Sequence, residues 1–154
     1  MYNLENKICS FHVNDYHLVT ILMPYIYEAT KEEKHIITFF ENDLSSIYEK
    51  VLNTNKDFWD NKEQFNKVEW KNLKEGEEYA KTKTAENGTI AIVSGSKEFV
   101  EKINKVLFDV HTNFTLVNCF EVGVLNKDED IKIEEYEKML NTKGLVDIKK
   151  MNLV

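Results

Sequence analysis

A chain of 154 residues, 42% apolar and 31% charged, has the length and composition of one globular domain, residues 1–154, and not of a disordered or fibrous protein. Its net charge of −7, from 27 acidic against 20 basic residues, argues against nucleic acid as a partner, because general nucleic-acid binding depends on cationic neutralisation of phosphates. No apolar run approaches the roughly 20 residues of a membrane span, and residues 1–7 lack the features of a secretory signal, so we expect a cytoplasmic protein with no membrane partner.

Apolar residues follow a strand period and a helix period in turn along the chain. Alternating β-formers or continuous apolar runs indicate strands, and apolar residues three and four apart indicate helices. Pro24 falls inside the first predicted helix and predicts a kink, because proline lacks the N–H that a helix interior needs. The predicted elements in chain order are strand 7–13, helix 16–33, strand 35–40, helix 44–52, strand 68–73, helix 76–85, strand 89–93, helix 99–110, strand 114–122, helix 128–140 and strand 145–148.

This order of elements predicts an α/β fold. A regular succession of strands and helices is typical of a parallel sheet with right-handed crossovers. We therefore expect a three-layer, Rossmann-like sandwich with a mostly parallel sheet of about five strands, without a phosphate loop. Cys9 and Cys119 lie in two of the predicted strands, with no CxxC pair, and are predicted to be buried and unpaired.

Residues 58–70 crowd aromatic side chains into a polar stretch and have two interpretations. The segment can fold back over the sheet as a lid. Alternatively, Trp59 and Trp70 can form an exposed apolar patch of the kind that marks an interface, and a two-fold homodimer is then the expected assembly.

Ligands of open parallel α/β sheets bind beyond the carboxyl ends of the strands, so the residues that leave the predicted strands are the candidate binding residues. All basic residues are Lys, so an anion there would have to be held by Lys, backbone N–H groups or hydroxyls. The predicted ligand-binding residues are His12, Asn14, Glu41, Asp43, Ser94, Gly95, Ser96, Lys97 and Glu121.

The turn at 94–97 has the residue types of an anion site or of a helix start. The full GxxxxGK[ST] spacing is absent, so no phosphate loop is expected. Backbone N–H groups of residues 94–96 could hold an anion at the start of the next helix, or Ser96 could simply cap that helix.

Acid–base and metal chemistry are weaker interpretations of the same residues. Ser94, His12 and Glu41 could converge as nucleophile, base and orienting acid, but no GxSxG elbow is present. Glu41 and Asp43 could join His12 around a divalent ion, although carboxylates at strand ends are more often caps and solvated charges. We therefore predict no catalytic residue, metal ligand or cofactor.

Five short segments of the chain carry a combined pattern: 8–12 (ICSFH), 22–25 (LMPY), 34–40 (KHIITFF), 92–96 (IVSGS) and 116–121 (LVNCFE). Together they resemble the MEDS family of sensory domains, found in regulators of the DcmR type and in other bacterial signalling proteins. The family opens with I-C-x-F-Y, and its first helix carries L-x-P-[FY]. An apolar strand, an R-V-x-G-E strand and an A-L-C-x-Y-D strand follow. The five segments correspond to these motifs in the same order.

The resemblance covers residues 7–142 and implies a non-catalytic sensory domain with a fold similar to RecA-like ATPases. Its expected partner is a small molecule or a signalling protein, and its expected role lies in bacterial signalling or regulation. The residues alone leave a second function open, a small enzyme acting on a phosphorylated or acyl substrate at the turn of residues 94–97 with His12.

Overall fold

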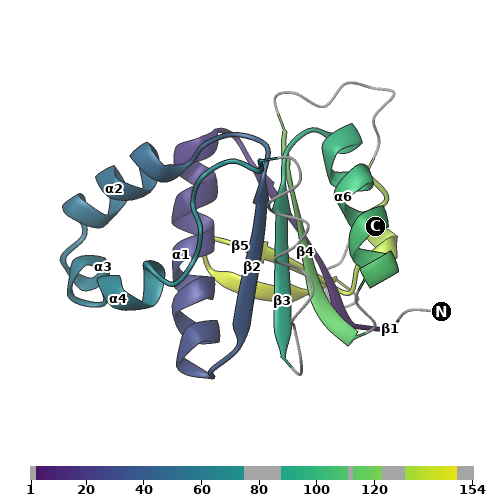
Figure 1. The fold of residues 1–154 in the computed structure, drawn as a ribbon, viewed down its shortest axis with the longest axis horizontal. Helices are drawn as coiled ribbons and strands as arrows, with labels where there is room; N and C mark the ends of the chain where they lie inside the picture. The colour runs from purple at the N-terminus through teal and green to yellow at the C-terminus, as the bar shows by residue number, and fades with distance from the viewer. Residues whose placement is uncertain (1–2, 75–87, 111–112, 123–130, 149–154) are drawn as a thin grey trace.

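The computed structural model describes residues 3–74, 88–110, 113–122 and 131–148. They form a six-stranded sheet with helices on both faces (Figure 1). The elements are β1 (Asn3–His12), α1 (Asp15–Lys31), β2 (His35–Phe40), α2 (Ser45–Thr54), α3 (Lys56–Asp60), α4 (Lys62–Phe65), β3 (Thr89–Ser94), α6 (Lys97–Val110), β4 (Asn113–Glu121), a 3-10 turn (Ile133–Glu135), β5 (Lys138–Asn141) and β6 (Gly144–Asp147).

The strand order is β2-β3-β4-β1-β5-β6. Every neighbouring pair is parallel except β5 and β6, which form an antiparallel hairpin. The prediction of an α/β fold with a mostly parallel sheet is confirmed, and the sheet has six strands where about five were expected. Because β1 to β4 run in the same direction, their carboxyl ends meet at one edge of the sheet.

Two apolar clusters lie on opposite faces of the sheet. On one face, α1 buries Leu22 and Ile26 against side chains such as Ile8, and α2 and α4 pack beside it. On the other face, Ile103 and Leu107 of α6 pack against apolar side chains of β3 and β4. Figure 1 shows α1 to α4 on one side of the strands and α6 on the other, an arrangement consistent with three layers.

The predicted strand at 68–73 is wrong, because these residues cross the edge of the sheet. Trp70 belongs to the cluster on the α1 face and Leu73 to the cluster on the α6 face. The Leu73 N–H donates to the Phe40 carbonyl at 2.7 Å. The segment thus passes round the edge of β2, and its apolar alternation comes from this crossing.

The predicted helix over 128–140 is wrong in its described part, residues 131–140. Tyr136 packs on the α6 face, whereas Leu140 packs on the α1 face. The backbone between them extends into β5, which pairs with β1, and the Ser10 hydroxyl donates to the Leu140 carbonyl at 2.8 Å. Contacts with a strand 130 positions away therefore decide the conformation.

The remaining predicted elements are present, with ends shifted by a few residues, except for the helix at 76–85, which lies outside the described residues. The helix assignment of α1 continues across Pro24. Cys9 and Cys119 are buried and unpaired, as predicted, and burial raises the pKa of the Cys9 thiol to about 11.

The aromatic segment after α2 is divided between core and surface. Phe65 and Trp70 are buried, and Trp70 stacks on Tyr48 with ring centroids 4.5 Å apart. Trp59 is 44% exposed, with the Lys62 ammonium 4.1 Å from the centre of its ring. Trp70 is therefore part of the core, which supports the lid interpretation for this end of the segment.

Candidate functional site

A cavity of about 160 Å³ opens at the carboxyl ends of β1 to β4, beside the start of α6. We call it the carboxyl-edge cavity. Most of the predicted binding residues line it, although they come from four separate segments of the sequence. Its lining residues are His12, Asp15, Leu18, Phe40, Glu41, Asn42, Leu44, Ser94, Gly95, Ser96, Lys97 and Glu121.

Two predicted binding residues are used elsewhere. Asn14 caps α1, where its side-chain oxygen accepts from the His17 N–H at 2.8 Å. Asp43 accepts from the hydroxyl and the backbone N–H of Ser45, and these hydrogen bonds lower the pKa of its carboxyl group. Neither residue lines the carboxyl-edge cavity.

The N-terminus of α6 already holds a carboxylate of the same chain. Glu41 Oε1 accepts from the Ser96 N–H at 2.8 Å, and the Ser96 hydroxyl oxygen accepts from the Phe99 N–H at 3.2 Å. A Cβ atom at position 95 would lie 2.8 Å from Glu41 Cβ, so glycine permits this approach. Ser96 is thus a helix cap, and Glu41 occupies the N–H group that an external anion would need.

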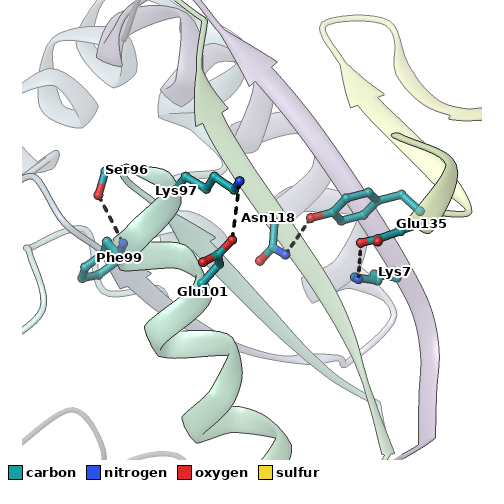
Figure 2. A network of polar contacts seen from close by, with 8 residues as sticks. Lys7, Ser96, Lys97, Phe99, Glu101, Asn118 and Glu135 are labelled. Carbon is teal, nitrogen blue, oxygen red and sulfur yellow. Dashed lines mark hydrogen bonds and ion pairs between the residues drawn. The ribbon is translucent and has the colours of Figure 1, made fainter. Parts of the chain in front are cut away.

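Negative charge dominates the cavity lining. Lys97 is the lysine among the lining residues, and its ammonium group lies 3.9 Å from Glu101 Oε1 on the next turn of α6 (Figure 2). Asp15, Glu41 and Glu121 contribute carboxylates. This balance favours a ligand that donates hydrogen bonds or carries positive charge over a phosphorylated one.

His12 is the buried polar group of the cavity. It is 3% exposed, and its Nδ1 atom has no hydrogen-bond partner within the described part of the chain. Burial, with a smaller contribution from the charge of His17, lowers the pKa of His12 to about 4. At neutral pH the imidazole is therefore uncharged and offers one nitrogen as an acceptor.

A catalytic relay is not formed by these side chains. Among the described hydrogen bonds, none joins Ser94 to His12, although both line the cavity. Glu41 is engaged with the Ser96 backbone and does not orient His12. Within residues 3–74, 88–110, 113–122 and 131–148, no three His, Cys, Asp or Glu side chains are grouped as metal ligands.

Several cavity residues were not predicted. Asp15 and Asn42 stand next to predicted residues in the same strand exits, and this position was the available signal. Leu18, Phe40 and Leu44 are apolar residues of predicted helices and strands, which gave no sign of a ligand site. They are buried and form the apolar wall of the cavity.

Comparisons of the chain with protein-family models, with curated proteins and with solved structures find no match. None of the helices in the described residues is long and apolar enough to cross a membrane. What the chain binds therefore has to be inferred from the residues of the site.

Proposed function

We propose that this protein is a non-catalytic, ligand-binding sensory domain of bacterial signalling that works in the cytoplasm. The ligand of the carboxyl-edge cavity would be a small polar molecule that donates hydrogen bonds, such as a primary amine. The unpartnered Nδ1 atom of buried His12 is the observation that carries this proposal.

The energetics of His12 favour a donor ligand. A buried polar atom without a partner costs about 1–3 kcal/mol, and a ligand N–H or O–H that reaches it recovers much of that free energy. Asp15 and Glu121 line the same cavity and would accept further hydrogen bonds from a cationic ligand. The volume of about 160 Å³ restricts the ligand to a small molecule.

The resemblance to MEDS sensory domains supports the same function. Four of its five segments, 8–12, 34–40, 92–96 and 116–121, contribute residues to the cavity, among them His12, Ser94 and Glu121. We propose that the sheet is of the RecA-like kind without a phosphate loop, and that the domain reports ligand binding to a signalling protein.

The alternative function, a small enzyme acting on a phosphorylated or acyl substrate at the turn of residues 94–97, has less support. Such an enzyme needs His12 to take a proton from Ser94, and these side chains make no hydrogen bond in the described structure. A phosphorylated substrate would also meet the Glu41 carboxylate at the start of α6.

Two probes of similar size and opposite charge test the proposed function. We expect ethanolamine to raise the melting temperature, because a ligand that binds only the folded state stabilises it, and to shift the NMR signals of His12. Glycolate should do neither. Glu121→Gln should weaken the response to ethanolamine, and Glu98→Gln, on the exposed first turn of α6, is the matched control.

Two results would contradict the proposal. One is stabilisation by glycolate but not by ethanolamine. The other is hydrolysis of p-nitrophenyl acetate by the wild-type protein that is lost in Ser94→Ala, which would establish the enzyme instead.

A homodimer is part of the same proposal, with Trp59 as its contact. Trp59 is 44% exposed on α3, whereas Trp70 is in the core and cannot serve. Light scattering should give a mass near twice 18.1 kDa that returns to the monomer value in Trp59→Ala. A monomer at all concentrations would exclude this interface.

A further inference from the structure

A second and larger cavity, of about 500 Å³, lies between α1 and the β5–β6 hairpin. We call it the helix–hairpin cavity. Ile8, Ile90 and Leu140 form its apolar floor on the sheet. β1, β3 and β4 contribute Asn6, Ile8, Ile90 and Thr115 to this cavity and their last residues to the carboxyl-edge cavity, and the two linings share no residue, so the two sites are separate.

The two walls of this cavity differ in charge. On the helix wall, Glu28 lies on α1 and Glu32 at its C-cap, and Lys34 follows before β2; on the hairpin wall, Lys138 and Lys143 are both lysines. Within the described part of the chain, none of these five side chains takes part in an ion pair. Acids on one wall and lysines on the other can each contact a separate charge of one ligand.

Tyr25 adds a polar group to the apolar interior. Its ring lines the cavity and is half-buried, and its hydroxyl makes no hydrogen bond to the described residues. A tyrosine hydroxyl both donates and accepts, so it can bind either a carboxylate or an ammonium group.

We propose that the helix–hairpin cavity binds an amino acid with an apolar side chain. The side chain would pack on Ile8, Ile90 and Leu140. The ammonium group would face Glu28 and Glu32, and the carboxylate would face Lys138 and Lys143. This site goes beyond the proposed function, because it takes a different ligand in a separate cavity.

Size and charge together select this ligand class. A cavity of about 500 Å³ lies within the roughly 300–1,000 Å³ of typical small-molecule sites. An apolar carboxylate would leave the acidic wall without a partner and bring its negative charge close to Glu28. An apolar amine would do the same at the lysine wall. A zwitterion with an apolar side chain satisfies both walls.

Three molecules that share a phenyl-ethyl skeleton test the proposal by isothermal titration calorimetry. L-phenylalanine carries both charges, 3-phenylpropionate only the carboxylate, and phenethylamine only the ammonium. We expect L-phenylalanine to bind about tenfold more tightly than either analogue, because each lost charge removes a charge-assisted hydrogen bond. L-leucine, with an aliphatic side chain, should bind in the same way.

Variants assign the binding to this cavity. Glu28→Gln and Lys138→Gln should each weaken L-phenylalanine binding by about tenfold, and Ala29→Leu should block it by filling the cavity, whose wall includes Ala29. Lys102→Gln, on the exposed surface of α6, is the matched control. Circular dichroism of each variant checks that the fold is intact.

Three outcomes would overturn the proposal. Neither amino acid binds, or 3-phenylpropionate or phenethylamine binds as tightly as L-phenylalanine, or Glu121→Gln at the carboxyl-edge cavity abolishes amino-acid binding while Glu28→Gln leaves it unchanged. Phenethylamine is itself a primary amine, the class proposed for the carboxyl-edge cavity, so its binding is also measured in Glu121→Gln, and binding that this variant weakens is assigned to that cavity and does not count against the inference. The response to ethanolamine is measured separately, so failure of this inference and failure of the proposed function remain distinguishable.

Discussion

The two cavities share three strands, β1, β3 and β4, but take different residues from them and differ in how they are built. The carboxyl-edge cavity takes its polar residues from short stretches that directly follow strands, and one of its carboxylates is already bound to a helix N-terminus. The helix–hairpin cavity depends on the β5–β6 hairpin, which reaches α1 from the far end of the sequence. Local strand exits thus create the first cavity, and long-range packing creates the second.

The largest expected effect tests whether the hairpin belongs to the core. Leu140 is 2% exposed and lies on the floor of the helix–hairpin cavity. Leu140→Ala should lower the free energy of unfolding by about 2–5 kcal/mol, since a truncated buried leucine leaves a void. Leu145→Ala, on the same hairpin at 44% exposure, should have a much smaller effect. Urea denaturation of both variants measures the difference; equal losses would mean that β5 does not pack as described.

The next effect is a pH dependence that belongs to the carboxyl-edge cavity. Because the pKa of His12 is about 4 in the folded protein and about 6.5 when unfolded, the unfolded chain takes up this proton first as the pH falls. The free energy of unfolding is therefore unaffected by the ionisation of His12 above about pH 6.5. It falls as the pH decreases, by about 3 kcal/mol in all once the pH is below about 4. His12→Gln should remove this component, and His35→Gln, at an exposed position, should keep it. Denaturant unfolding at several pH values between about 4 and 7 measures this. If the free energy of unfolding depends on pH equally in the wild type and in His12→Gln, the assignment to His12 is wrong.

Gly95 and Gly144 are required for different reasons: the first because there is no room for a Cβ atom, the second because of its positive φ. A Cβ atom at Gly95 would meet Phe99 and Glu41 at 2.7 and 2.8 Å, whereas one at Gly144, with φ +111°, would meet nothing within 4 Å. We expect each alanine variant to lose about 1–3 kcal/mol, from overpacking at Gly95 and from backbone strain at Gly144. NMR separates them, because only Gly95→Ala should displace Glu41 and shift the Ser96 amide signal. An unchanged Ser96 signal in Gly95→Ala would refute the close approach.

The smallest effect concerns the internal cap of α6. Glu41→Ala removes the carboxylate that accepts from the Ser96 N–H and should cost about 1 kcal/mol, as for other helix caps. Glu49→Ala, an exposed glutamate within α2, is the control and should change stability less. Equal effects in thermal unfolding would show that the Glu41 contact contributes nothing.

The sequence predicted the central part of the fold because its signals are local. The apolar run at 35–40 became β2, and the helical stripe from Phe99 became most of α6. Strand ends are local signals as well, and they place His12, Glu41 and Ser94 at one edge of the sheet, where all three line the same cavity.

The misassigned segments depend on partners far away in the chain. Tyr136 and Leu140 have helical spacing, but they pack on opposite faces of the sheet because β5 pairs with β1. Trp70 and Leu73 are divided between the faces in the same way. The periodicity of a single sequence contains no information about such partners. The carboxyl-edge cavity could therefore be predicted from the sequence, whereas the helix–hairpin cavity could not.

The position of β1 in the sheet has a consequence for the order in which the protein folds. β1 lies between β4 and β5, and the hydrogen bond from Ser10 to Leu140 spans 130 positions. A ribosome therefore completes β1 long before either neighbouring strand exists. Pairing over such separations is slow, because the loop between the strands must close first. During synthesis the edges of β1 therefore stay open to pairing with other chains until β4 and β5 have been made.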